Sequence, residues 1–249
     1  MITNMRPLCL IGGMCMYADL HIHSTYSDGT DTPAELMEIA KQEGLSVVAI
    51  ADHDSVAGIK ALAEAGIDNP VRNIPAIEIS TISNRRLLHM LGYYIDANNP
   101  ELNAFINEIS VDKTENTRIN FTKLVEQEGL DYEWERVIAL NPGQPRLSGV
   151  HVVHAVEQDG CMPNGMTPRH MFRRYFLPTG EAFIETEKMT AYDAVDIIKK
   201  AGGVPVIAHP VSIGDDTVVL DLIRYGVQGL EVYHHSHTRE DNERYAQMA

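Results

Sequence analysis

The chain has 249 residues, of which 44% are apolar and 22% charged, and 20 basic against 35 acidic residues give a formal net charge of −15. This composition is typical of a globular protein with a core of substantial size, and it excludes nonspecific coating of nucleic acid by a broad basic surface. Three scattered cysteines, Cys9, Cys15 and Cys161, exclude a disulfide framework and a thiolate zinc site.

The N-terminal segment is apolar over residues 8–16, where only Arg6 precedes it. It is too short for a membrane span, which needs roughly 18 apolar residues, so we expect no membrane partner. Two interpretations stay open: a weak signal-peptide core, or an N-terminal extension over residues 1–16 with Met14 or Met16 as the true start. The second is favoured, with the cytoplasm as the expected location.

Strands and helices are predicted to alternate over residues 17–100. Continuous apolar runs are typical of strands buried on both faces of a parallel sheet, and Pro and Gly mark the helix ends. The predicted strands cover residues 17–22, 45–51, 74–79 and 87–95, and the predicted helices cover 33–44 and 56–65. This order indicates an α/β fold with parallel pairing and right-handed crossovers.

The alternation stops at residue 101. Helical patterns over residues 102–129, 149–160 and 169–176 are separated by Asn-Pro-Gly and Pro-Asn-Gly turns. We therefore expect residues 101–185 to form a helical insertion in a barrel built from residues 17–100 and 186–249. The second part of the barrel is predicted to contain helices at 191–201, 218–225 and 239–249 and strands at 204–208 and 229–233.

Imidazoles and carboxylates occur at or near the ends of the predicted strands. They are His21, His23, Asp52, His53, Asp54, Glu78, His89, His209, His234, His235 and His237. In parallel α/β folds the carboxyl ends of the strands converge on one face, which carries the active site. A convergent group of this kind favours a multinuclear metal site, and ligands without thiolate suit Mn²⁺, Zn²⁺ or Fe²⁺.

Each of these motifs has a structural alternative when taken alone. His-x-His pairs occur by chance, and residues 51–54 are also consistent with solvated charges and Asp54 as a helix N-cap. His89 is also consistent with a core histidine, and His209 with a loop residue. Glu78, between Ile77 and Ile79, is harder to explain structurally, because an unpaired buried charge is costly.

Several segments together resemble the PHP (polymerase and histidinol phosphatase) family. They are residues 19–30 (DLHIHSTYSDGT), 51–54 (ADHD), 78–80 (EIS), 89–93 (HMLGY) and 208–210 (AHP). The resemblance implies a distorted (β/α)7 barrel with two to three divalent metal ions. It assigns His21 and His23 to one metal, with Glu78 bridging to a second metal held by His89 and His209; Asp28 and His53 bind the third.

The resemblance extends to the stand-alone branch of the family, which includes nucleoside 3′,5′-bisphosphate phosphatases, 5′-to-3′ exoribonucleases and a cyclic-phosphate dihydrolase. Members usually carry Arg-Pro-His in the insertion, facing the substrate phosphate. Aligned on His151, this sequence has Gly149 and Val150, and the nearest arginine is Arg146. We predict Arg146, His151 and His237 as the residues that bind phosphate or protonate the leaving oxygen.

Family members also end with a seventh strand that carries Gly-Ser-Asp-x-His, and no such motif follows residue 237 here. We therefore expect a barrel that lacks its seventh strand, from an incomplete chain or with a partner segment filling the gap.

The predicted function is a metal-dependent phosphohydrolase acting on a phosphorylated nucleotide or short oligonucleotide. The alternatives are a cyclic phosphodiester hydrolase, a histidinol phosphatase and, from another class, a noncatalytic or truncated metal-binding module.

Overall fold

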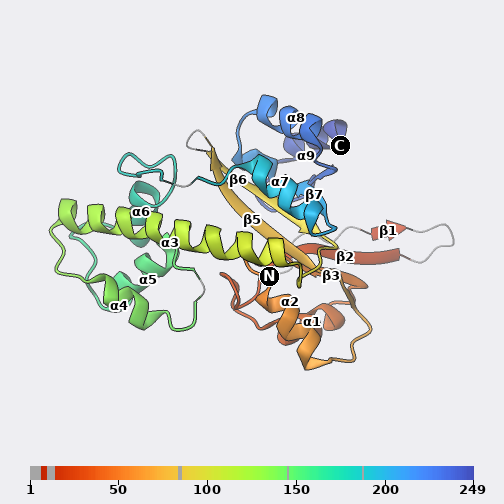
Figure 1. Cartoon of the computed structure of the whole chain (residues 1–249), viewed down its shortest axis with the longest axis horizontal. Helices are drawn as coiled ribbons and strands as arrows, with labels where there is room; N and C mark the ends of the chain where they lie inside the picture. The colour runs from red at the N-terminus through yellow and green to blue at the C-terminus, as the bar shows by residue number, and fades with distance from the viewer. Residues whose placement is uncertain (1–6, 10–14, 84–85, 145, 187) are drawn as a thin grey trace. The chain divides into compact units, whose positions relative to one another are not determined.

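A computed structural model describes residues 7–9, 15–83, 86–144, 146–186 and 188–249 (Figure 1). Most of the predicted N-terminal extension, with Met14, lies outside these residues. The chain forms two compact units: Met1–Thr81, Leu87–Ile106 and Thr190–Ala249 make the first, and Ile82–Arg86 with Asn107–Met189 the second. Within the described ranges, no helix is long and apolar enough to cross a membrane.

One sheet of the first unit contains β1 (Pro7–Cys9), β2 (Cys15–Ile22), β3 (Val47–Ile50) and β4 (Arg72–Asn73), in that spatial order. β2, β3 and β4 pair in parallel. Parallel pairing of the first two was predicted, but β4 was not a predicted strand, and the strand predicted over residues 74–79 lies mainly in β5 of the other sheet. β1 pairs antiparallel with the start of β2, and this pairing extends β2 back to Cys15, beyond the predicted start at Tyr17.

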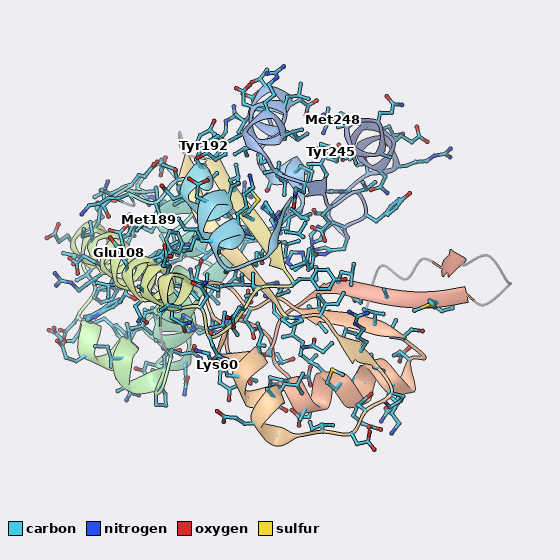
Figure 2. The ribbon with its side chains drawn as sticks, turned by 45° about the vertical axis from the view of Figure 1, so that its right-hand side comes forward. Lys60, Glu108, Met189, Tyr192, Tyr245 and Met248 are labelled. Carbon is cyan, nitrogen blue, oxygen red and sulfur yellow. The ribbon has the colours of Figure 1, made fainter. Side chains whose placement is uncertain are left out.

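Two helices cover this sheet, α1 (Pro33–Gln42) and α2 (Ala57–Ala65). A capping box between Thr32 and Glu35 starts α1, and glycines in the left-handed region follow both helices. The buried side chains between α1, β3 and the loop before β4 are Met37, Ala40, Leu45, Val48 and Val71. From α2, Lys60 (Figure 2) donates a hydrogen bond of 2.7 Å to Oδ1 of Asn103.

The second sheet has the order β5 (Ala76–Ser83), β6 (Arg86–Tyr93), β7 (Val204–Ile207) and β8 (Gly229–Leu230). β7 and β8 are parallel, but β6 runs antiparallel to β7. The predicted all-parallel order therefore fails at β6. Only two residues separate β5 from β6, and a parallel pair needs a crossover of a dozen or more.

Three helices and a short turn of 3₁₀ helix complete the first unit: α7 (Ala191–Lys200), η1 (Pro210–Ser212), α8 (Asp216–Tyr225) and α9 (Arg239–Met248). A parallel bridge between His53 and Glu78 connects the end of β3 to β5. Backbone hydrogen bonds on either side, from Asp54 N to Glu78 O at 2.9 Å and from Glu78 N to Asp52 O at 3.2 Å, fix its register.

The second unit is mainly helical. It contains most of α3 (Pro100–Glu128), then α4 (Trp134–Leu140), α5 (Gly149–Gln158) and α6 (Pro168–Tyr175). α4 has no counterpart among the predicted elements. The unit has its own core, in which Leu124, Val137, Val152, Met171 and Tyr175 are fully buried.

Candidate metal centre

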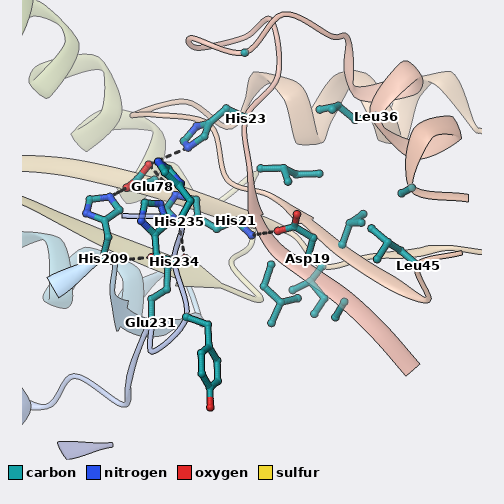
Figure 3. A pocket seen from close by; sticks show the side chains of 18 of the residues that line it. Asp19, His21, His23, Leu36, Leu45, Glu78, His209, Glu231, His234 and His235 are labelled. Atoms are coloured by element: carbon teal, nitrogen blue, oxygen red, sulfur yellow. Dashed lines mark hydrogen bonds and ion pairs between the residues drawn. The ribbon is translucent and has the colours of Figure 1, made fainter. Parts of the chain in front are cut away.

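Glu78 lies at the centre of the site. It occupies β5 between two fully buried isoleucines and is itself 1% exposed. An unpaired carboxylate at such a position is costly, and this one is surrounded by imidazoles (Figure 3). The five that contact it are His21, His23, His53, His89 and His209.

The imidazoles divide between the two carboxylate oxygens. Oε2 of Glu78 lies 3.1 Å from Nε2 of His21, 3.3 Å from Nε2 of His23 and 3.2 Å from Nδ1 of His53. Oε1 lies 2.8 Å from Nδ1 of His89 and 3.1 Å from Nε2 of His209. One carboxylate therefore faces two separate groups of nitrogen atoms, an arrangement suited to bridging two cations.

The fold explains why these residues meet. His21 and His23 come from the end of β2, His53 follows β3, and His209 follows β7. His89 reaches the same place from within β6, which runs the other way. Side chains at the ends of the parallel strands therefore lie together, and the antiparallel strand adds an imidazole from its interior.

Asp28 lies beside this group on the turn that follows β2. Its Oδ1 is 3.5 Å from Nδ1 of His23, and its Oδ2 is 3.9 Å from Nε2 of His53. Burial would raise the pKa of Asp28, but the neighbouring His53 and His23 lower it overall. Asp28 therefore supplies a carboxylate at the more exposed end of the cluster.

The donor set fits divalent cations. Nε2 of His21 and Nδ1 of His23 are buried and make no hydrogen bond, whereas buried polar atoms in proteins are nearly always bonded. Ligand atoms lie within 4.8 Å of one another in four sets among the described residues: His21, His23 and Glu78; His53, Glu78 and His89; His23, Asp28 and His53; His21, Glu231 and His234. Nitrogen and carboxylate oxygen ligands at this spacing are typical of sites for more than one transition metal.

Comparison with known proteins agrees with this geometry. The family model for the PHP domain matches residues 19–186. The chain belongs to the PHP domain family. A phosphoribosyl 1,2-cyclic phosphate 1,2-diphosphodiesterase of Eggerthella lenta is 31% identical over 94% of this chain and 89% of its own length. A 5′-3′ exoribonuclease of Haemophilus influenzae is 28% identical over 93% of this chain and 84% of its own.

A solved structure from Bifidobacterium adolescentis, classed as a metal-dependent phosphoesterase, is similar to the PHP chain with a TM-score of 0.79. It is 28% identical, and the match covers 93% of this chain and 82% of that one. Together with the relatives, it shows that the PHP chain is a hydrolase of phosphate esters in a metal-dependent class.

A buried carboxylate braces the turn that carries Asp28 in the PHP site. Asp52, 2% exposed, accepts hydrogen bonds of 2.7 Å from the Ser24 amide, the Ser24 hydroxyl and the Ser27 hydroxyl. Gly58 lies so close that a Cβ atom there would be 2.4 Å from Oδ2 of Asp52. Asp52 thus connects the end of β3 to the turn after β2.

Asp54 has a similar bracing role on the other side of His53. It is buried, takes a φ of 50°, and accepts a hydrogen bond of 2.9 Å from the amide of Ser80. The N-cap of α2 is Val56, which makes no side-chain cap. The alternative interpretation of Asp54 as a solvated helix cap is therefore wrong, because the parallel bridge at His53 draws this segment into the interior.

Replacing Asp52 by alanine is expected to lower the free energy of unfolding by about 2–4 kcal/mol, because it removes three hydrogen bonds to a buried charge and leaves their donors unpaired. Urea unfolding measures this loss. Asp68→Ala, at an exposed position, is the control. Equal stability of the two variants would contradict the bracing role of Asp52.

The pKa values of the metal-free cluster are strongly displaced. Burial and the positive potential of His89 and His23 lower the pKa of His53 to about 3, despite Glu78. Burial would lower the pKa of His21 as well, but its hydrogen bond to Glu231 and the negative charge of the adjacent Glu78 raise it to about 10. Burial opposes ionisation of Glu78, yet the surrounding histidines hold its pKa well below the usual range.

A cavity of 1480 Å³ opens onto the cluster, and the chain after β8 lines part of it. Glu231, His234 and His235 belong to this lining. Glu231 was not among the predicted site residues. It directly follows β8, which ends at Leu230, whereas the strand predicted over residues 229–233 placed it inside the strand, so the positional signal was hidden.

The described lining of this cavity includes none of the three residues predicted to contact substrate, Arg146, His151 and His237. Within the described lining, the segment after β8 contributes residues 231–236, and His237 is not included. Nδ1 of His237 donates to the carbonyl oxygen of Val232 at 2.9 Å. Arg146 and His151 belong to the second unit, where Nδ1 of His151 accepts a hydrogen bond of 3.0 Å from the Ser148 amide at the start of α5. Roles of these three residues in catalysis stay predictions.

Proposed function

We propose that the first unit is a PHP-type (β/α)7 barrel that holds two to three divalent ions, Mn²⁺, Zn²⁺ or Fe²⁺, for hydrolysis of a phosphorylated nucleotide or short oligonucleotide. His21, His23 and Glu78 would hold one ion, and Glu78 with His89 and His209 a second. Asp28 and His53 would hold the third. The observation that carries the proposal is the contact of five imidazoles with one buried carboxylate.

Bound divalent ions supply activation of water at neutral pH and stabilisation of charge on phosphate oxygens. The residues of the chain do the rest. Glu78 holds the two halves of the cluster together, and Asp52 holds the turn that carries Asp28. The cavity admits a small phosphate ester beside the cluster. Arg146, His151 and His237 stay proposed as phosphate-binding or proton-donating groups.

The overall charge supports a short substrate. A net charge of −15 repels a long anionic strand away from the cationic centre, whereas a mononucleotide or strand end needs only the centre itself. A five-membered cyclic phosphodiester is a second candidate, favoured by the 31% identity to the Eggerthella lenta diphosphodiesterase.

The test is hydrolysis by the purified chain loaded with Mn²⁺, using adenosine 3′,5′-bisphosphate, a short 5′-phosphorylated RNA and a ribose 1,2-cyclic phosphate as separate substrates. We expect turnover of at least one, with two to three ions per chain by elemental analysis. A protein that holds its metals and hydrolyses none of the three would reject the proposed substrates. One ion or none per chain would favour the noncatalytic alternative.

Metal binding is expected to release protons at pH 7.5. His21 has a pKa of about 10 in the metal-free protein, so it is protonated there, and a cation can bind only the deprotonated nitrogen. The raised pKa also stabilises the metal-free fold fully below about pH 6.5, and this contribution is lost as the pH rises toward 10. Calorimetric titration with Mn²⁺ in two buffers of different ionisation enthalpy measures the release.

Thermal unfolding in chelator at pH 6.5, 8 and 9.5 measures how the stability of the metal-free fold depends on the charge of His21. The melting temperature should fall as the pH rises across the series. His21→Ala should flatten the slope. A metal-free protein that gains stability from pH 6.5 to 9.5 would contradict the charged state assigned to His21.

A further inference from the structure

Glu231 is held in a fixed position beside the metal cluster. It directly follows β8, and its amide donates a hydrogen bond of 2.9 Å to the carbonyl oxygen of Ile207, which continues the pairing of β7 with β8. Its side chain is 13% exposed and points toward the cluster (Figure 3). The backbone therefore fixes where this carboxylate lies.

The two oxygens of Glu231 accept hydrogen bonds from two different ligand-bearing segments. Oε1 accepts from Nδ1 of His21 at 3.0 Å, and Oε2 accepts from the amide of His209 at 2.7 Å. His21 lies at the end of β2 and His209 directly follows β7. A single carboxylate thus connects the ends of two strands that belong to different sheets.

The bond to His21 determines which nitrogen is available to a cation. A carboxylate accepts and cannot donate, so it favours the tautomer that carries the proton on Nδ1. The lone pair of Nε2 is then directed to Glu78, whose Oε2 is 3.1 Å away. This is the buried nitrogen that makes no hydrogen bond. A carboxylate on the far nitrogen of a metal-binding histidine sets the ring orientation and raises its basicity.

The bond to His209 holds a strained backbone. His209 has a φ of 23°, which a residue with a side chain rarely adopts, and such strain persists only where the surroundings enforce it. In this conformation Nε2 of His209 lies 3.1 Å from Oε1 of Glu78. The amide bond to Glu231 therefore supports the geometry of a second predicted ligand.

We propose that Glu231 is a positioning residue for the metal centre: it selects the Nδ1-protonated tautomer of His21 and fixes the backbone of His209, without itself contacting a metal ion. This inference rests on the proposed metal-dependent function. It assigns Glu231 a role that the predicted ligand set did not include. His21, Glu231 and His234 are close enough to hold a cation, but the proposal assigns no ion to that set.

The test compares Glu231→Gln, Glu231→Asp and the exposed control Glu240→Gln. Glutamine has one acceptor oxygen, so it can accept from only one of the two donors. Aspartate keeps the charge but is one methylene shorter, so it cannot span both. We expect both Glu231 variants to bind Mn²⁺ about 10–100-fold more weakly in a chelator competition, with unchanged stoichiometry at saturation, and the control to match the parent chain.

The protein loaded with Zn²⁺ provides an independent readout. In ¹⁵N-resolved NMR spectra, His21 should carry its single proton on Nδ1 in the parent chain, and Glu231→Gln should shift population toward the tautomer with the proton on Nε2. Unchanged tautomer and affinity in Glu231→Gln would overturn the proposal, and so would parent-like affinity in Glu231→Asp, since charge alone would then suffice. Loss of one whole ion from both Glu231→Gln and His234→Ala would also overturn it, because Glu231 would then be a ligand.

These measurements need no turnover. If the parent chain binds metals but hydrolyses none of the test substrates, the substrate proposal fails while the role of Glu231 is still measured. If Glu231→Gln binds metals as the parent does, the positioning role fails while hydrolysis by the parent chain is unaffected.

Discussion

Replacing Glu78 by glutamine is expected to lower kcat/KM for a phosphate ester by about 1,000-fold or more. Glutamine has nearly the same volume, but it turns one acceptor oxygen into an amide donor that faces imidazole nitrogens. The variant also loses the negative charge that bridges the two halves of the cluster. Charge stabilisation by bound ions is worth several kcal/mol, and each 1.36 kcal/mol corresponds to a tenfold change in rate.

The measurement is steady-state hydrolysis together with metal content by elemental analysis. Glu64→Gln changes an exposed glutamate on α2 in the same way and should keep full activity. Circular dichroism shows whether Glu78→Gln is folded. A folded Glu78→Gln variant with parent-like metal content and activity would show that this carboxylate does not bridge the ions.

Replacing Leu124 by alanine should have the opposite effect to Glu78→Gln. We expect a large loss of stability and no loss of bound metal. Leu124 lies in α3 with no exposed surface, packed in the core that contains Val152, Met171 and Tyr175. Removing a buried leucine side chain costs about 2–5 kcal/mol, depending on how far the cavity collapses. All predicted metal ligands belong to the other unit, so the number of ions per chain should not change.

Val111→Ala is the matched control, since Val111 is on the same helix and 72% exposed. Its unfolding free energy should lie within about 0.5 kcal/mol of the parent. Urea unfolding followed by circular dichroism compares the variants. If Leu124→Ala were no less stable than Val111→Ala, or if it released its metals while still folded, the second unit would not have the independent core described above.

The metal cluster was predictable because its signals are local. His21 and His23 follow an apolar strand, and Glu78 lies between two isoleucines where a lone charge is costly. Convergence of strand ends then brings such residues together in a parallel fold. The same reasoning predicted most helices, whose caps and terminal glycines are visible in the sequence.

Most of the remaining features depend on contacts between distant segments. The antiparallel direction of β6 follows from the short connection between β5 and β6. The predicted strands were only seven residues apart, already too few for a parallel crossover, so this direction could have been predicted. The roles of Asp52 and Glu231 depend on hydrogen bonds to Ser24 and to His21, 28 and 210 residues away in the chain. No periodicity or local motif contains that information.

The bridge between His53 and Glu78 makes two predicted ligands part of the backbone pairing itself. Side chains alternate between faces along a strand, so slipping this pair by one residue would turn the carboxylate away from every imidazole at once. The centre therefore cannot accommodate an inserted or deleted residue beside either partner. Length changes in this lineage should accumulate in the outer turns and leave these two short stretches at constant spacing.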